Sequence, residues 1–189
     1  NFDICFNRNL VINFFRKNKL KYSETYREPI AILPVYKGPR GFVLWDAKDK
    51  WYLKWQEALN SVDGLVKLKL AKGNFSLNRI LTANILLKSN VDLIKKLINN
   101  ENTNALIIVV AEPKMIKNGK TYLSTYAKYY NDNGKFESSL YRNKTALKTA
   151  SSFYNVNQTL LKDEVLNIIS SIEINWKKNN LIDTSVYNE

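Results

Sequence analysis

The sequence predicts an α/β fold: a single mixed sheet with helices packed on it, in the order β-α-β-α-β-α, followed by an antiparallel meander and a C-terminal helix. Residues 105–111 are an unbroken apolar run, which has the length of a strand buried on both faces. Asn-Gly dipeptides at 118–119 and 133–134 are flanked by alternating segments, a pattern typical of β-hairpins. Segments of helical periodicity separate the earlier strands, which favours helices between them.

The first third of the chain begins with an alternating segment, residues 2–6, which predicts a short strand. Asn7 or Asn9 then caps a helix with an apolar stripe that includes Leu10 and Phe14. Residues 30–36 are almost entirely apolar and predict a strand covered on both faces. Pro34 has no N–H to donate, so pairing should break there or the strand should lie near an edge.

Three of the four tryptophans follow this strand within eleven residues. Residues 38–41, Gly-Pro-Arg-Gly, predict a turn and 42–45 an extended segment. Asp46 or Asp49 then caps a helix that ends near residue 60. Trp51 and Trp55 are four positions apart and share one face of that helix, which favours core packing over a binding surface.

The rest of the chain completes the sheet. Alternation predicts a strand at 65–70, and helical periodicity predicts helices at 76–87 and 91–99. The meander is expected from strands at 106–116, 120–131 and 135–142. A final helix should start at Thr159 or Asp163 and run to residue 176. With no internal repeat or low-complexity linker, we expect one domain over residues 1–178 and a tail over 179–189.

The formal net charge of +12 raises the question of nucleic-acid binding. Lys outnumbers Arg by 23 to 6, and Asn occurs 25 times. These residues have AT-rich codons, so genome composition alone can produce the charge, and Arg, the better bidentate reader of phosphate, is scarce. The lysines are also dispersed along the chain. The composition therefore makes nucleic acid the alternative partner and not the leading one.

The usual signatures of an enzyme are missing from the sequence. There is no histidine and a single cysteine, Cys5, which removes Ser-His-Asp and Cys-His mechanisms and the common zinc sites. The six glycines form neither nucleotide-binding fingerprint. Glu112, at the end of a buried strand, is the one carboxylate worth examining as a site, and its position also suits an ordinary surface residue. We therefore expect no enzyme and predict no catalytic, cofactor-binding or metal-binding residue.

Exposed aromatic and turn residues are the candidates for contacting a partner. Arg40 lies at the predicted turn, and Trp45 lies where the chain leaves the sheet. Tyr122, Tyr126 and Tyr130 share one face of the middle meander strand. If that face is open it forms a platform, and if the final helix covers it the tyrosines are packing residues. No apolar run approaches the roughly 20 residues needed to span a bilayer.

The segments 2–6, 30–36 and 44–46, with the Trp51-x-x-x-Trp55 pair, resemble a group of proteobacterial envelope proteins of unknown function. In that group a "VLP" strand precedes an "LW…NPW…W" segment. The present chain has Leu33-Pro34-Val35 in its strand, and Asp49-Lys50-Trp51 replaces Asn-Pro-Trp. The resemblance covers residues 2–60 and extends loosely to 176.

The resemblance implies an exported, alphaproteobacterial periplasmic protein whose fold is similar to the amino-terminal domain of TolB and to the curli-secretion lipoprotein. It also implies that a signal peptide preceded Asn1. Such domains serve as assembly or interaction modules, and no catalytic residue carries over. We therefore expect a non-enzymatic envelope protein that binds another envelope protein, membrane-embedded or part of a larger complex. The alternatives are a nucleic-acid-binding module that uses the lysines and the tyrosine face, and an enzyme centred on Glu112.

Overall fold

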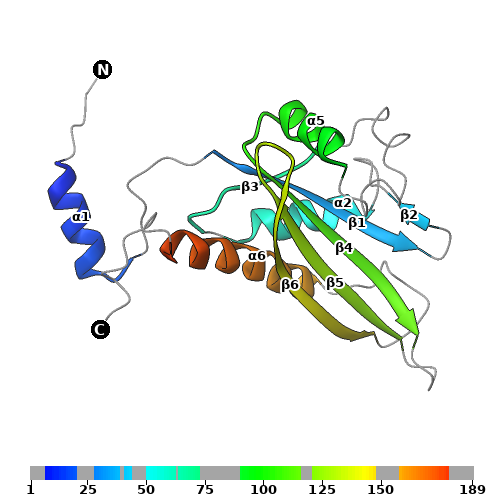
Figure 1. The fold of residues 1–189 in the computed structure, drawn as a ribbon. Coiled ribbons are helices and arrows are strands. Elements are labelled where there is room, and N and C mark those ends of the chain that lie inside the picture. The colour runs from blue at the N-terminus through cyan, green and yellow to red at the C-terminus, as the bar shows by residue number, and fades with distance from the viewer. Residues whose placement is uncertain are drawn as a thin grey trace.

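A computed structural model describes residues 7–20, 28–38, 41–43, 50–62, 64–72, 90–115, 121–147 and 158–178. It confirms the predicted α/β class, with a six-stranded mixed sheet in the order β2-β1-β4-β5-β6 and β3 paired to β1 (Figure 1). The helices are α1 (Arg8–Lys17), α2 (Lys50–Asn60), α5 (Val91–Glu101) and α6 (Gln158–Lys178). The strands are β1 (Ile30–Gly38), β2 (Gly41–Val43), β3 (Leu68–Leu70), β4 (Leu106–Met115), β5 (Thr121–Tyr130) and β6 (Phe136–Leu147).

The expectations for residues 2–6, 76–87 and 179–189, for the Asn118-Gly119 turn and for capping by Asp46 or Asp49 lie outside the described residues.

The parallel pair β1 and β4 forms the centre of the sheet, with Ala31 opposite Leu106 and Tyr36 opposite Ala111. Both strands are apolar at consecutive positions because both of their faces are covered. One face packs against α2 and α6, and the other packs against α5. Sequence periodicity identified these strands correctly because burial on two faces removes the alternation seen in half-exposed strands.

Pro34 lies inside this central strand, at a place where its missing N–H is tolerated. The N–H groups of Ala31 and Ile30 point to opposite neighbours, toward β4 and toward the segment that enters β3 respectively. By alternation the nitrogen of Pro34 points away from β4, like that of Ile30. On that side β3 pairs only with residues 30–32 and β2 only with 36–38, so Pro34 faces the gap between them. The predicted interruption of pairing is confirmed on this side of β1.

The described helices α2, α5 and α6 pack in two core clusters, one on each face of the sheet, and the tryptophans Trp51, Trp55 and Trp176 all belong to the cluster of α2 and α6. Trp51 and Trp55 are 2% and 0% exposed, and their rings meet edge-on at 5.8 Å, which confirms that they are packing residues. The C-terminal helix α6 lies on the same side of the sheet and buries Trp176 in the same cluster. It begins at Gln158, so the alternative start at Asp163 is excluded.

The strand β3 is shorter than the predicted segment 65–70. The N–H of Leu65 donates to Glu173 Oε1 of α6 at 3.1 Å, and Glu173 is 6% exposed. This bond joins the start of the segment to the helix, and the carbonyl of Lys67 already accepts from the N–H of Ile30 of β1 at 2.9 Å. The residue pairs with β1 begin at Leu68, opposite Ile30, the first residue of that strand.

The hairpin between β5 and β6 differs in detail from the type I′ turn that Asn133-Gly134 favours. The N–H of Gly134 donates to the carbonyl of Asn131 at 2.9 Å, and Gly134 has a φ of +74°. Asp132 and Asn133 do not have positive φ, whereas a type I′ turn requires it at both central residues. The loop is a three-residue hairpin with glycine in the left-handed position, so the dipeptide identified the hairpin but not the turn type.

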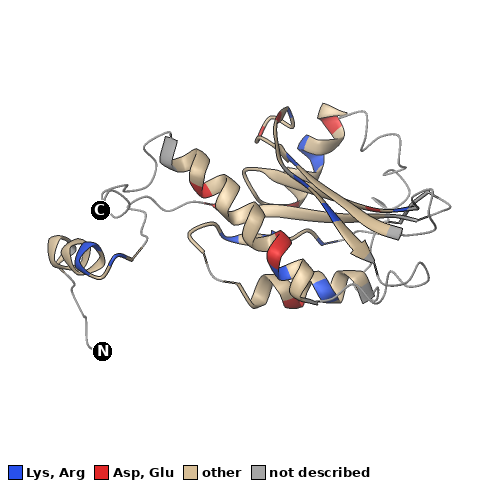
Figure 2. Ribbon diagram, turned by 90° about the horizontal axis from the view of Figure 1, so that it is seen from below, with Lys and Arg blue, Asp and Glu red and all other residues tan. Residues whose placement is uncertain are grey.

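Helix α1 lies apart from the sheet and from α2, α5 and α6 in both views (Figures 1 and 2). The side chain of Asn7 caps its first turn by accepting from the N–H groups of Asn9 and Leu10. At its C-terminal end Lys19 has a φ of 54°, and the N–H of Leu20 donates to the carbonyl of Phe15. This is the arrangement of a Schellman ending, with lysine in the position usually held by glycine.

Among the described helices, none has the combination of length and hydrophobicity required to cross a bilayer.

Candidate partner-binding face

The tyrosines of β5 lie on the sheet face opposite α2 and α6, which answers the question posed by their spacing. Thr125, on the α6 side, bonds to Glu164, whereas the even-numbered residues of β5 point the other way. The final helix therefore does not cover Tyr122 or Tyr126. Among the described helices, α5 packs on their side, at the end of the strand where Tyr130 lies.

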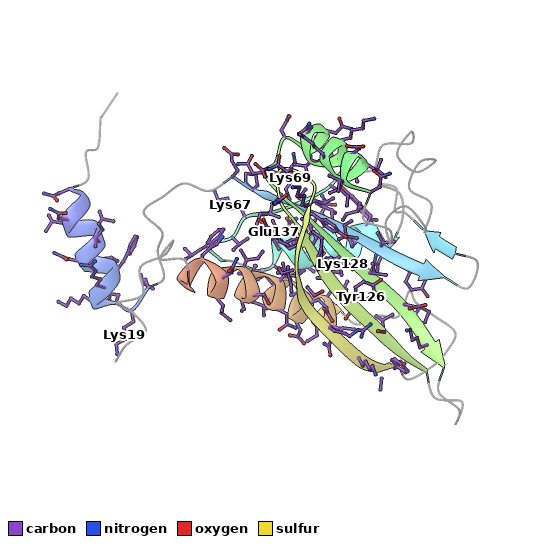
Figure 3. The ribbon with its side chains drawn as sticks, viewed as in Figure 1. Lys19, Lys67, Lys69, Tyr126, Lys128 and Glu137 are labelled. Carbon is purple, nitrogen blue, oxygen red and sulfur yellow. The ribbon has the colours of Figure 1, made fainter. Side chains whose placement is uncertain are left out.

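Strand register brings basic residues from three segments beside these tyrosines. Tyr122 is opposite Lys114 of β4, and Tyr126 is opposite Arg142 of β6. Ser124, between the two tyrosines, is opposite Lys144. Because residues paired in register project to the same face, these side chains share one surface with Lys128. We call this surface the basic tyrosine face, and it consists of Lys114, Tyr122, Tyr126, Lys128, Arg142 and Lys144 (Figure 3, where Tyr126 and Lys128 are labelled).

The aromatic rings of this face lie close to cations. Lys144 Nζ is 5.7 Å from the ring centroid of Tyr122, and Lys128 Nζ is 5.9 Å from that of Phe136. Contacts of this kind at exposed sites contribute about 0.5–1 kcal/mol each. Tyr122 and Tyr126 are half-buried, whereas Arg142 and Lys144 are exposed. The two tyrosines are thus partly accessible at the surface of the sheet.

The charge of this face is positive. Of the described residues paired at these positions, four are basic and Glu112 is the one acid. Glu112 Oε2 is 3.3 Å from Lys114 Nζ, and its side chain is 23% exposed. This is the geometry of a partly exposed ion pair at a strand end. The described residues of this face therefore carry a local excess of positive charge.

Tyr130 has a different role from the other two tyrosines. It is 0% exposed, its ring packs edge-on against Phe136 at 5.9 Å, and it belongs to the cluster formed with α5. A partner cannot reach it, so the interpretation of Tyr130 as a contact residue is replaced by a packing role. Tyr130 has the same place in the alternation of β5 as Tyr122 and Tyr126. It is more deeply buried because α5 packs at its end of the strand. Arg40 and Trp45 lie outside the described residues.

The sequence pattern did not single out Arg142, Lys128 or Lys144 as members of a site. Each is one of many dispersed cations along the chain. The hairpin signal at 133–134 and the alternation of its two strands give a first estimate of which residues pair, because register follows from loop length in a regular hairpin. Two irregularities in the β5–β6 register, after Ala127 and after Tyr129, shift that pairing and defeat a simple count from the turn.

A second feature is a hollow of about 370 Å³ between β6 and the last turns of α6. Hydroxyl groups of Ser138, Ser139 and Ser171 line it together with Tyr129 and Trp176. The hydroxyl of Ser171 donates to the carbonyl of Asn167 at 2.7 Å, so it serves the helix. Unlike the basic tyrosine face, this hollow is not lined by a cluster of charged side chains. No chemistry follows from its lining.

Within the described ranges, no group of three or more His, Cys, Asp or Glu side chains is arranged to hold a metal ion. The buried carboxylate Glu164 is 0% exposed and accepts from Thr125 Oγ1 at 2.7 Å. Its contacts tie α6 to β5, so its observed role is structural.

No family model matches the sequence, and a search of curated proteins finds no match. Comparison with solved structures finds the PelC dodecamer from Paraburkholderia phytofirmans, at 10% identity and a TM-score of 0.43, covering 79% of this chain and 94% of that one. Lipoprotein GNA1162 from Neisseria meningitidis is 17% identical with a TM-score of 0.42, covering 77% and 98% of the two chains.

The hypothetical protein CT253 from Chlamydia trachomatis is 15% identical with a TM-score of 0.36, covering 82% of this chain and 98% of its own. The three structures come from bacteria, and one is described as a lipoprotein. Identities and scores this low carry no conclusion about function. The resemblance to TolB stays a prediction.

Proposed function

We propose that this chain is a non-enzymatic binding module of the bacterial cell envelope that holds an acidic protein partner on the basic tyrosine face. The observation that carries the proposal is the gathering of Tyr122, Tyr126, Arg142 and Lys144 on the side of the sheet opposite α6. The cations of this face come from three consecutive strands, β4, β5 and β6, and their register gathers them around two tyrosines.

The residue types on this face suit a protein partner. Tyrosine and arginine are enriched among the residues that dominate binding energy at protein interfaces. Tyr126 and Arg142 are directly opposite each other at the centre of this face. The surrounding lysines would speed association with an acidic surface and disfavour basic competitors. The partner is therefore expected to present carboxylates around an apolar or aromatic contact.

The envelope location rests on the sequence resemblance of residues 2–60 to envelope proteins. Cell fractionation tests it separately from the binding role. Recovery of the native protein in the periplasmic or membrane fraction is the expected result. Exclusive recovery with cytoplasmic markers would contradict the location and leave the binding surface to be judged on its own.

Single-stranded nucleic acid is the second candidate, because half-buried tyrosines between lysines also form stacking platforms for bases. The scarcity of arginine in the chain and the presence of Glu112 within the face favour protein. The two candidates differ in what is attached to the face in cells, and one experiment distinguishes them.

The experiment places a photo-crosslinking amino acid at position 126 in the full chain, expressed in the source cells. The expected product is an adduct that protease removes and nuclease leaves intact. A matched chain carries the probe at Lys67, which is exposed and distant from the face (Figure 3), and should give no such adduct. A nuclease-sensitive adduct would establish the nucleic-acid alternative, and the same adducts from both positions would refute a specific surface.

Charge reversal provides the complementary test. The double variant Arg142→Glu/Lys144→Glu should abolish the adduct at position 126, since it replaces two exposed cations of the face. The control Lys67→Glu/Lys96→Glu makes the same change in net charge at two other exposed lysines and should leave the adduct intact. Equal loss in both variants would show that net charge, and not this surface, governs association.

A further inference from the structure

The amphipathic helix α1 carries an exposed apolar flank that the sheet and its helices do not use. Leu10 and Phe14 are 68% and 58% exposed, although they belong to the apolar side of the helix. They are four positions apart and therefore lie one above the other on the helix surface. Leu20, just beyond the helix end, is 45% exposed. Large side chains exposed together in this way indicate a surface that is covered by something else.

The polar residues of α1 are neutral or basic. Asn9 and Asn13 are exposed beside the apolar pair, and Arg16 and Lys17 occupy the last turn of the helix. No acidic residue occurs between residues 8 and 20. In Figure 2 the helix shows blue segments and no red one, and it lies away from the acidic segments of α6.

We infer that α1 docks on the surface of an anionic lipid bilayer, with Leu10 and Phe14 entering the boundary between headgroups and acyl chains. An amphipathic helix with Leu and Phe on one side and basic residues beside them has the composition of an interfacial helix. Its ten residues extend about 15 Å, so it lies along the surface and does not cross it. The lipid phosphates neutralise Lys17 and the neighbouring cations.

A second copy of the helix is a poorer occupant for the same flank. Two parallel copies packed through Leu10 and Phe14 would bring their basic last turns together. Two antiparallel copies would bring each last turn to the first turn of the other copy, which begins with Arg8 and has no acidic residue to offset the charge. Like charges at short range oppose such pairing, whereas an anionic surface gains from every cation. This charge pattern selects lipid as the occupant.

The inference is independent of the proposed protein-binding face, because the helix and the β5–β6 surface are separate parts of the molecule (Figure 1). It adds a means by which the chain is concentrated at a membrane without a spanning segment.

The test is co-sedimentation of the full chain with vesicles of phosphatidylglycerol mixed with phosphatidylcholine, and with vesicles of phosphatidylcholine alone. The wild-type chain should sediment with the anionic vesicles and stay in solution with the neutral ones. Added salt should reduce the bound fraction, because the electrostatic part is screened. Absence of binding to the anionic vesicles, or equal binding to both kinds, would overturn the inference.

The variant Leu10→Ser/Phe14→Ser should weaken binding to anionic vesicles by about tenfold or more, since it removes both apolar anchors. The matched control Asn9→Ser/Asn13→Ser places serine at two exposed polar positions of the same helix, which removes no apolar anchor, and should keep most of the binding. Lys17→Glu should weaken binding and leave its apolar anchors in place. Equal loss in the serine variant and its control would overturn the assignment of the flank.

Three further measurements keep the result specific. Thermal unfolding of the Leu10→Ser/Phe14→Ser variant should match the wild type, because these side chains do not belong to either core cluster. The sheet variant Arg142→Glu/Lys144→Glu should retain vesicle binding, which separates this inference from the proposed function. Sedimentation equilibrium that shows self-association dependent on Leu10 and Phe14, together with no vesicle binding, would replace lipid by a second copy.

Discussion

The hydroxyl of Thr125 supports a buried carboxylate, and its removal is the sharpest stability test that the fold offers. Glu164 is 0% exposed, and its Oε1 accepts from Thr125 Oγ1 at 2.7 Å and from Asn143 Nδ2 at 3.4 Å. The second contact is long for a hydrogen bond, so Thr125 is the main donor. Glu164 Oε2 is buried and has no hydrogen-bond partner among the described residues.

Thr125→Val keeps the size of the side chain and suits a strand, so its effect isolates the hydrogen bond. Removing the donor leaves a buried acceptor unsatisfied, which costs about 1–3 kcal/mol and more for a charged group. We therefore expect the variant to lose about 2–3 kcal/mol of unfolding free energy. For a chain of 189 residues this lowers the melting temperature by about 4–12 °C.

Urea unfolding followed by tryptophan fluorescence measures this change, because Trp51, Trp55 and Trp176 lie in the core on the α6 side of the sheet. The midpoint should fall with no change in the slope m. The double variant Thr125→Val/Glu164→Met should recover most of the loss, since replacing both partners by apolar groups leaves no buried charge. A single variant within about 0.5 kcal/mol of wild type would refute the hydrogen-bond assignment.

Two other predictions concern the hairpin tip and Tyr52. Gly134→Ala should destabilise the protein by about 2–4 kcal/mol in the same urea assay, because a Cβ would lie 2.5 Å from the carbonyl oxygen of Val91 at a residue whose φ is +74°; unchanged stability would contradict the close packing of this hairpin on α5. The pKa of Tyr52 is raised above its ordinary value, first by burial and then by the charge of Glu101. The unfolded chain therefore releases this proton first, so stability should fall as the pH rises above about 10. Tyr52→Phe should lessen that fall, and identical alkaline unfolding of the two proteins would refute the shift.

Local patterns in the sequence were sufficient for most of the secondary structure. The four-residue spacing of Trp51 and Trp55 predicted a buried helix face, and the structure confirms it. The apolar run at 105–111 predicted a strand buried on both faces, as β4 is. Such predictions succeed because the periodic spacing and the side chains that become buried belong to the same short segment. The turn type at Gly134 and the short β3 do not follow from local patterns, since one depends on the packing of the loop on α5 and the other on where β3 meets the start of β1.

The candidate site required the folded chain. Tyr122, Tyr126 and Tyr130 are equivalent in sequence spacing, yet α5 buries the last of them and leaves the other two half-buried. Likewise Arg142 and Lys144 become neighbours of these tyrosines only through a register that contains two irregularities.

The sequence by itself determined the fold class, the core tryptophans and the lack of histidine chemistry, because each depends on residue identity and local spacing. The tertiary structure alone decided which tyrosines face solvent, where the break beside Pro34 falls and which dispersed cations share a surface. Those features depend on contacts between segments far apart in the chain, and local periodicity carries no record of such contacts.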